Sequence, residues 1–583
     1  MRRIFCCAAM ALLYGAASAA PTADMVLRNG AVVTLDAQNT VLQALAVTDG
    51  HIVYTGNDND VRPYIGPNTR VIDLQGRMLM PGLIDAHMHP QSGGARLLNC
   101  NLNYEKLTVP QFQARIQACI DKDGERDPKR WLVVVNWFQQ GMQPDGVAMS
   151  HAMLDALRTR RPVLVRSSFG HSVLLNTRAM QLAGVRDNTP DPHGGKIARD
   201  AAGKATGLLE DAAQDMAMNL LPPLTPAENL AASARALDAM RRQGVTTFLD
   251  AYTDPETLTA FAALQRQHKL TARAHFAVLV EPKDSPKKAV ASIRQLARRF
   301  DQGPARAEPS MQVRHAKLFM DGVIAAPALT GAMLAPYYSE SRGEWAPGSS
   351  AGPDSYFTQP ALRAMLAALA AARIDPHIHV DGDRAVRDTL DAVEALRATP
   401  HGKAARPALA HNEIVDPVDY SRFAQLDATA VLSFQWAKPA PDTVGALKPY
   451  MGPLRYDLVE PQELLRQAGA RIAFGSDWPV DPLDQWFALK VAVTRTAAPD
   501  AGEEYAGRLG TQPGMPRLAA LRAITIDAAY VLRQEKDTGS LEVGKLADMI
   551  VLDRDYFTVP EEEIARIKVL RTIVGGKTVY EAE

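Results

Sequence analysis

From residue 81 onward, the chain repeats one pattern, a short apolar segment followed by a stretch long enough for an amphipathic helix. The apolar segments that we interpret as barrel strands are 82–87, 245–251, 272–279, 313–322, 373–382, 408–415, 429–436 and 471–480. Strands that alternate with helices are typical of a parallel α/β sheet, and eight such strands close a (β/α)8 barrel. We therefore predict an α/β fold with a TIM barrel comprising residues 81–91 and 226–510, followed by a final barrel helix region at 511–535.

The barrel pattern is interrupted directly after its first strand. Residues 92–225 are too long for a simple loop and contain helix and strand patterns of their own, so we predict an α/β insert that covers the barrel mouth. Residues 21–80 and 536–583 instead show short alternating runs, and the first of these segments carries Asn-Gly and Asp-Gly turn signals. These two segments predict a small β-sandwich built from both ends of the chain.

Residues 1–20 have the pattern of a signal peptide. Two arginines precede the apolar run IFCCAAMALLYGAA, and the small residues ASAA follow as a cleavage site. We predict an exported protein, periplasmic or secreted, with no transmembrane span after cleavage. The alternative is a retained membrane anchor, although the apolar run is shorter than the ~20 residues that a span requires.

The mature chain would keep two of the four cysteines, Cys100 and Cys119. An oxidising compartment allows them to form a disulfide. Two free buried thiols are an equally good interpretation of the sequence.

The composition and charge of the chain narrow the choice of partners. Hydrophobic residues make up 47% and charged residues 22%, as in an ordinary globular protein. Lys and Arg total 64 and Asp and Glu total 65, so the formal net charge is −1 and creates no long-range field for a polyanion. We predict a small-molecule substrate and no binding of nucleic acid.

The first barrel strand ends in the sequence PGLIDAHMHP, residues 81–90. His87 and His89 are two residues apart, so both side chains project from the same strand face. Pro90 lacks the backbone donor that would continue the strand. Two imidazoles at the carboxyl end of a barrel strand indicate half of a metal site, whereas two hydrogen-bonded core histidines are the alternative.

Other strand ends carry further donors: Lys317, His377, His379, His411 and Asp477. Nitrogen and carboxylate donors at one barrel face favour zinc or another first-row divalent metal over magnesium or calcium. A buried lysine would have a lowered pKa and so become a nucleophilic amine. Such an amine can take up carbon dioxide to form a carbamate, which can bridge two cations.

Together these motifs resemble the amidohydrolase superfamily, specifically the amidohydrolase family 3 branch that holds D-aminoacylase-like and N-substituted formamide deformylase-like enzymes. The resemblance covers nearly the whole mature chain. Its motifs, in order, are MVLRNGAVVTLD, PGLIDAHMHP, KLFMDGV, HVDGDRAV, AHNEIVDPVDYSRFAQL, AFGSDWPVDP and GSLEVGKLADMIVL.

The resemblance implies a ligand set for two divalent cations. His87, His89 and Asp477 would bind the first, and carbamylated Lys317 would bridge to a second held by His379 and His411.

We choose His379 over His377 because HVDGDRA resembles the His-x-x-Gly-Asp stretch of the family. His377 is then expected behind the ligands or in the core. Asp383 is expected either to hydrogen-bond to a ligand or to cap the following helix.

The implied reaction is hydrolysis of a C–N amide bond in a small N-acyl or N-aryl compound by a metal-bridging hydroxide. Asp477 would carry the proton from the attacking water to the leaving nitrogen. His171 resembles a position that reaches over the metals in relatives, and Trp137 and Trp478 could form an apolar wall for the substrate. The alternatives are a surface loop for His171 and core packing for the tryptophans.

Two other functions fit the same scaffold. One is a different hydrolysis, of a cyclic amide or a carbamate or by deamination; the presence of Lys317 and the Asp-Gly-Asp segment at 381–383 favours amide hydrolysis. The other is a non-catalytic periplasmic protein that binds a metal or solute, which would need neither the lysine nor the strand-eight acid. Relatives often form dimers or larger assemblies, so the resemblance also allows a homo-oligomer.

Overall fold

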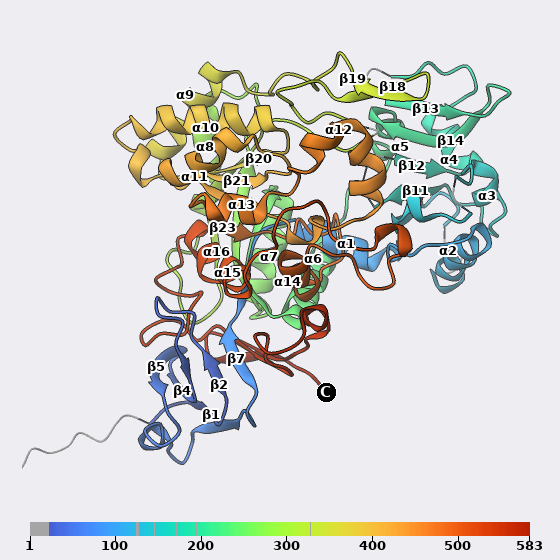
Figure 1. Cartoon of the computed structure of the whole chain (residues 1–583). Helices are drawn as coiled ribbons and strands as arrows, with labels where there is room; N and C mark the ends of the chain where they lie inside the picture. The colour runs from blue at the N-terminus through green and yellow to red at the C-terminus, as the bar shows by residue number, and fades with distance from the viewer. Residues whose placement is uncertain are drawn as a thin grey trace, which may run out of the picture.

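The computed structural model describes residues 22–583, apart from 124–126, 145, 169, 171, 193–194 and 327 (Figure 1). The predicted signal peptide and His171 therefore lie outside the described residues. Within the described part, no helix is both long and apolar enough to cross a membrane.

An eight-stranded parallel sheet forms the centre of the molecule. In chain order its strands are β8 (Leu83–Met88), β15 (Val245–Thr253), β16 (Arg273–Leu279), β17 (Met311–Phe319), β20 (Asp375–Val380), β21 (Ala408–His411), β22 (Thr429–Leu432) and β23 (Arg471–Phe474). The backbone N–H of Asp477, just beyond β23, donates to the carbonyl of His87 in β8 over 2.8 Å, which brings the two edge strands together. The predicted α/β barrel is confirmed.

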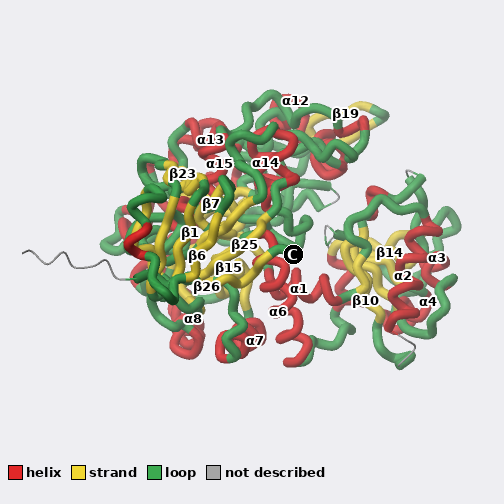
Figure 2. Tube along the Cα trace, turned by 90° about the horizontal axis from the view of Figure 1, so that it is seen from below, coloured by secondary structure: helices red, strands yellow, loops and turns green. Residues whose placement is uncertain are grey.

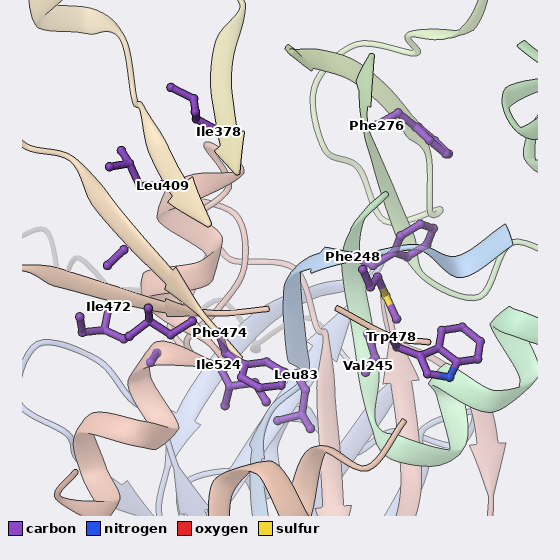
Figure 3. Packing of buried hydrophobic residues seen from close by; sticks show 14 of the residues in the cluster. Leu83, Val245, Phe248, Phe276, Ile378, Leu409, Ile472, Phe474, Trp478 and Ile524 are labelled. Atoms are coloured by element: carbon purple, nitrogen blue, oxygen red, sulfur yellow. The ribbon is translucent and has the colours of Figure 1, made fainter. Parts of the chain in front are cut away.

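Helices follow the barrel strands and bury them on the outside. They are α7 (Pro255–Arg266), α8 (Pro286–Phe300), α9 (Gln359–Ala371), α10 (Asp383–Arg397), α11 (Tyr420–Gln425), α13 (Gln462–Gln467), α14 (Gln485–Thr494), α15 (Arg517–Ala523) and α16 (Ile526–Val531). Phe248 and Phe276 project from neighbouring strands (Figure 3), and Phe261 of α7 packs on both, with ring centroids 5.5 Å apart in each pair. Helices cover one face of these strands, and packed side chains cover the other. The strand sequences are therefore apolar almost throughout.

The insert after β8 has a sheet of its own, in the order β13-β14-β12-β11-β10-β9. Its strands are β9 (Cys100–Asn101), β10 (Leu132–Trp137), β11 (Val163–Ser167), β12 (Ser172–Leu175), β13 (Gly195–Arg199) and β14 (Ala205–Asp211). The accompanying helices are α2 (Val109–Asp123), α3 (His151–Asp155), α4 (Thr177–Ala183) and α5 (Asp215–Met218). A disulfide joins Cys100 of β9 to Cys119 of α2, so these two cysteines are paired.

Two helices connect the insert to the barrel. α1 (Pro90–Leu98) leaves the first barrel strand, and α6 (Pro226–Gln243) returns the chain to the second. The side chain of Thr225 accepts from the Glu228 N–H, and the Glu228 side chain accepts from the Thr225 N–H, which fixes the start of α6. Figure 2 shows the insert as a separate layer beside these two helices.

Both chain ends build the β-rich part below the barrel (Figure 1). One sheet has the order β5-β4-β1-β6 and the other the order β26-β25-β24-β7-β2-β3. The strands are β1 (Met25–Arg28), β2 (Ala31–Val33), β3 (Val41–Leu42), β4 (Ala44–Thr48), β5 (His51–Gly56), β6 (Arg70–Asp73), β7 (Met78–Pro81), β24 (Met549–Leu552), β25 (Val569–Val574) and β26 (Lys577–Glu581). Leu27, Leu45, Leu79, Met549 and Ile573 share one hydrophobic core, so residues from both ends stabilise it.

The loop between β17 and α9 contains a hairpin, β18 (Tyr338–Ser341) and β19 (Glu344–Pro347). Trp345 of β19 contacts Tyr450 of α12 (Lys448–Tyr456) edge to face, with ring centroids 5.0 Å apart. This long polar segment therefore packs on another loop of the barrel rim.

Candidate metal centre

His87, His89 and Asp477 form the first group of donors at the carboxyl ends of the barrel strands. The Nε2 atoms of His89 and His87 lie 3.1 and 3.4 Å from the Asp477 Oδ1 atom. Asp477 has a φ of 52°, in the left-handed region that non-glycine residues rarely adopt, and this turn aims its carboxylate at the histidines. The side chain of His89 is 25% exposed and that of His87 only 2%, so His89 faces the open side of the group.

A second group consists of His379 at the end of β20, Asp381 just beyond it and His411 at the end of β21. One donor atom from each lies within 4.8 Å of the others. The Nδ1 atom of His411 is 4.0 Å from Asp477 Oδ2, and the His87 and His411 rings are 4.7 Å apart. The two groups are therefore contiguous at one rim of the barrel.

Lys317 and His377 lie beneath these groups. The Lys317 Nζ atom is 3.5 Å from His87 Nε2, and burial lowers the pKa of this lysine to about 8. The His377 Nε2 atom contacts His87 Nδ1 at 2.7 Å, which leaves the other ring nitrogen of His87 facing Asp477 and Lys317. A partner behind a ligand histidine fixes its ring and tautomer in many metal sites. The structure thus places His377 behind His87, while His379 lies beside His411.

The protonation states of this rim suit metal binding. Burial lowers the pKa of His87, His379 and His411 well below the ordinary value, so these imidazoles are neutral and keep a lone pair for a cation. Burial alone would raise the pKa of Asp477, but the hydrogen bond with His89 and the electrostatic interactions with His411 and Lys317 lower it to about 2. Asp477 is therefore a carboxylate at neutral pH.

Four more acids, none of them expected as a ligand from the sequence, surround the rim: Asp85, Asp321 and Asp381, which are buried, and Glu413, which is half-buried. Burial raises the pKa of Asp85 to about 6, of Asp321 to about 7 and of Glu413 to about 8. The Oδ1 atom of Asp381 has no hydrogen-bond partner in the described part of the chain. Because buried carboxyl groups need a cation, a proton or several donors, this excess of acid over the single Lys317 fits divalent cations at the rim.

Asp85 and Asp321 also hold the backbone that carries the candidate ligands. Asp85 accepts from the backbone N–H groups of His87 and Ser476 and from the side chain of Gln485. Asp321 accepts from the backbone N–H groups of Ala332, Asp381 and Gly382. Each carboxylate thus fixes the chain next to a ligand, a role that no local sequence pattern signals.

The comparison with known proteins agrees with this geometry. A model of the amidohydrolase family matches residues 70–580 of the chain. This protein belongs to the amidohydrolase family. The putative amidohydrolase YtcJ of Bacillus subtilis (strain 168) is 25% identical over 563 residues, which cover 95% of this chain and 99% of that protein. The N-substituted formamide deformylase of Arthrobacter pascens is 25% identical over 575 residues, covering 96% of this chain and 98% of that protein.

A solved structure shows the same fold. It is an uncharacterized metal-dependent hydrolase from Pyrococcus horikoshii OT3, with a TM-score of 0.69 and 21% identity over 92% of this chain and 99% of that one. The predictions of family and of hydrolytic enzyme are thus confirmed.

Three residues expected at the active site have other surroundings. Trp137 is fully buried in the core of the insert, 5.9 Å from the Phe112 ring. Trp478 is 3% exposed and belongs to the barrel core, where a Cβ atom at Gly93 would lie 2.4 Å from its indole ring (Figure 3). The burial of Trp137 corrects its expected place in an apolar wall, whereas a substrate contact of Trp478 stays a prediction.

Asp383, the third, opens α10 and accepts from the Leu334 N–H over 2.7 Å. It anchors the loop after β17. His171, expected over the metals, lies outside the described residues.

Proposed function

We propose that this amidohydrolase cleaves the C–N bond of a small N-acyl or N-aryl amide with two divalent cations, zinc being the favoured metal. One observation supports this proposal most directly. The carboxylate of Asp477 lies within 4.0 Å of a ring nitrogen of each of His87, His89 and His411. His379 and Lys317 complete the set from neighbouring strands. The cations would supply Lewis acidity and a water that is nucleophilic at neutral pH.

The residues of the chain divide the remaining work. Asp477, ionised at neutral pH, accepts the proton of the attacking water and returns it to the leaving nitrogen. An amine leaves readily only when protonated, so this transfer favours an amide substrate. His377 and Asp85 hold the imidazole and the backbone of His87, and the exposed edge of His89 marks the side from which substrate enters.

Lys317 is proposed to carry a carbamate. Its Nζ atom forms a bond to the carbon of CO₂ and loses a proton, which converts a buried cation into an anionic oxygen donor. The lowered pKa of Lys317 supports this step, because more of the amine is unprotonated than in an exposed lysine. Two bound divalent cations would compensate the negative charge of the carbamate as well as that of the nearby carboxylates.

We also propose that the protein is exported from the cytosol. The disulfide between Cys100 and Cys119 supports an oxidising compartment. Mass analysis of protein recovered from the periplasm or medium checks this point, with a mature chain that starts near Pro21 as the expected result. A chain that keeps residues 1–20 in the cytosol would contradict it.

The decisive experiment combines metal analysis with turnover of a panel of N-acyl amino acids and aryl amides. We expect two divalent cations per chain and hydrolysis of at least one amide. Stoichiometric metal without any hydrolysis would instead support the binding-protein alternative.

A lysine variant tests the carbamate. Lys317→Ala should lose the bridging donor and activity, and short carboxylic acids such as acetate should restore part of it. Lys490→Ala is the matched control, because Lys490 is equally buried but binds Thr496 and Glu562 away from the rim. A fully active Lys317→Ala protein would break the two-metal model.

A further inference from the structure

A cleft of about 360 Å³ lies where the insert joins the barrel, and this volume is in the range of small-molecule pockets, roughly 300–1,000 Å³. Helices α1 and α6, which lie between the barrel and the insert in Figure 2, form two of its walls. Tyr104 and Asn136 line it from the insert, and residues of the segment 478–483 line it from the barrel. No proposed metal ligand is among its described lining residues, so a ligand in the cleft can bind without touching the cations.

The half-buried guanidinium of Arg96 lines this cleft from α1. Its Nη1 atom donates to the Pro479 carbonyl over 2.8 Å and to Asn136 Oδ1 over 3.2 Å, and the Tyr104 hydroxyl donates to the same carbonyl over 3.1 Å. These partners are neutral, and no carboxylate oxygen of the described residues lies within 4.0 Å of the guanidinium. Because the two bonds use only some of the N–H donors of a guanidinium, Arg96 keeps donors and a charge for a ligand.

The lining of the cleft carries more positive than negative charge. Arg96, Arg235 and Arg242 line it, whereas Asp238 is the single acid among its described lining residues. Asp238 already pairs with Arg235 at 2.8 Å, with Arg242 at 3.2 Å and with Arg241, which does not line the cleft, at 2.7 Å. One carboxylate therefore serves three arginines of α6 and leaves none for Arg96, which favours a bound anion.

Apolar side chains form the rest of the lining. Leu97 of α1 and Leu483 of the barrel segment are half-buried and pack against the barrel core, and Ala239 lines the cleft from α6. An inorganic anion would leave these side chains facing water. An organic anion would cover them with its own apolar part, and burial of that surface would add to the binding free energy.

We propose that this cleft binds a small organic anion, with its carboxylate on Arg96 and its apolar body against Leu97 and Leu483. Guanidinium groups bind carboxylates through paired, charge-assisted hydrogen bonds, which explains the preference for this class of anion. The inference goes beyond the proposed hydrolysis, because neither the cations nor the reaction takes part in binding.

Isothermal titration calorimetry of the full chain tests the proposal, once with the metal-loaded protein and once after chelation. The probes are phenylacetate, benzoate and hexanoate, with 2-phenylethanol as the neutral analogue and acetate as the anion without an apolar body. We expect at least one of the three larger anions to bind one site per chain with a Kd below about 1 mM. It should bind about 10- to 100-fold more tightly than 2-phenylethanol, the usual effect of hydrogen bonds to a charged group, and equally well in both metal states.

Two variants that act on different walls locate the site. Ala239→Phe fills the cleft from α6 without touching Arg96, and Arg96→Gln removes the charge; each should weaken binding at least about 10-fold. Arg96→Lys should keep part of the affinity. Ala234→Phe is the matched control, an exposed alanine of the same helix that does not line the cleft, and it should bind like the unmutated protein. Urea unfolding checks that each variant is folded.

Several results would overturn the proposal. One is that no larger anion binds, and another is that 2-phenylethanol or acetate binds as tightly as they do. Binding that disappears on chelation would place the anion on the metals instead. Full affinity in folded Ala239→Phe would place it elsewhere on the protein. Because chelated protein is part of the test, a failure of the proposed amide hydrolysis would leave these outcomes unchanged.

Discussion

At the carboxyl ends of the barrel strands, Asp381 has a buried oxygen without a hydrogen-bond partner in the described part of the chain, and Asp477 faces three histidines at 3.1 to 4.0 Å. At the amino ends of the same strands, buried acids are fully engaged. Arg273, the first residue of β16, donates to both oxygens of Asp548 over 2.6 and 2.9 Å, and the Gly575 N–H donates to the same carboxylate. Both members of this pair are at most 2% exposed.

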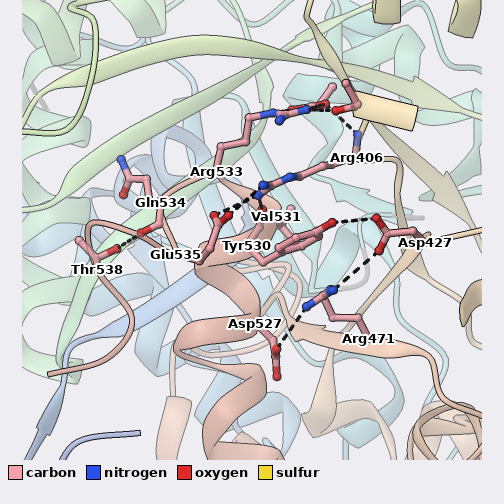
Figure 4. Close-up of polar contacts among 12 residues, drawn as sticks. Arg406, Asp427, Arg471, Asp527, Tyr530, Val531, Arg533, Gln534, Glu535 and Thr538 are labelled. Atoms are coloured by element: carbon pink, nitrogen blue, oxygen red, sulfur yellow. Dashed lines mark hydrogen bonds and ion pairs between the residues drawn. The ribbon is translucent and has the colours of Figure 1, made fainter. Parts of the chain in front are cut away.

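The rest of the lower end follows the same rule (Figure 4). Arg406 pairs with Glu535 at 2.8 Å, and Arg533 pairs with Asp375. The ring of Tyr530 lies between the guanidinium groups of Arg406 and Arg471, at 3.9 and 3.6 Å from the ring centroid, and its hydroxyl donates to Asp427. These contacts join strand starts to the turn after α16 and close the lower end of the barrel.

Buried charges thus have different surroundings at the two ends of the barrel sheet. The lower end pairs Arg273, Arg406 and Arg533 with buried or half-buried acids inside the protein, which stabilises the fold. At the upper end, Asp85 and Asp321 are held by hydrogen bonds, whereas Asp381 keeps an oxygen without such a partner among the described residues, as a cation site would. In barrels of this type the catalytic groups lie at the carboxyl ends of strands, and the opposite face serves stability.

The largest effect is expected from Asp477→Asn. The variant keeps the shape of the side chain but removes a proposed ligand charge and the proposed proton carrier, so kcat should fall by ~10²–10⁴-fold with little change in the unfolding free energy of the metal-free protein. Amide turnover and urea unfolding check the two parts. Asp383→Asn is the control, a buried acid near the same rim that holds only a loop, and it should keep kcat. If Asp477→Asn were as active as the unmutated enzyme, the carboxyl ends of the strands would not carry the catalytic acid.

Arg273→Met should show the reverse pattern. Removing one partner leaves Asp548 buried without its counter-ion, which should lower the unfolding free energy by about 3–5 kcal/mol. Activity per folded molecule should be unchanged. Arg314→Met, which breaks the more exposed pair with Asp301, should cost less than about 1 kcal/mol. A similar loss of unfolding free energy in both variants would show that burial does not determine how much an ion pair contributes to stability.

Metal removal should change the stability of the protein through the groups at the carboxyl ends of the barrel strands alone. A ligand that binds only the folded state at 100 times its Kd stabilises it by about 2.7 kcal/mol, so chelation should lower the unfolding free energy by a comparable amount. In the metal-free state Asp381→Asn should be more stable than the unmutated protein, because it removes one of several facing carboxyl groups. Thermal unfolding before and after chelation gives both values. A metal-free Asp381→Asn protein that is less stable would mean that the acids are already matched without cations.

The smallest effect concerns His275, buried in β16 between the two ends. Burial holds its pKa well below 6.5, so the folded state keeps this ring neutral while the unfolded chain takes up a proton as the pH falls. Stability should therefore decrease below about pH 6.5, with this residue contributing up to about 1.4 kcal/mol per pH unit. Urea unfolding of metal-free protein at pH 7.5 and 5.5 measures the slope, which should be shallower in His275→Gln. An identical slope would assign the pH dependence to other groups.

Several residues of the metal rim could be predicted because strand geometry is local. His87 and His89 are two apart at a strand end, and His411 and Asp477 follow other apolar segments in the same way. Asp85, Asp381 and Glu413 could not be predicted, since an acid next to a strand is as common on a surface as in a core. Trp137 was misassigned for the same reason, because an indole in a strand pattern does not reveal which layer covers it.

The alternation of apolar segments with helices, and the polar residues at their ends, determined by themselves that this chain forms a barrel with nitrogen and oxygen donors gathered at one face. Which buried charges find partners was decided only by the tertiary structure. Arg273 meets Asp548 across 275 positions of sequence, whereas Asp381 keeps one oxygen without a hydrogen-bond partner among the described residues. Periodicity is a property of neighbouring residues, but the compensation of a charge depends on every group that folding brings within a few ångströms.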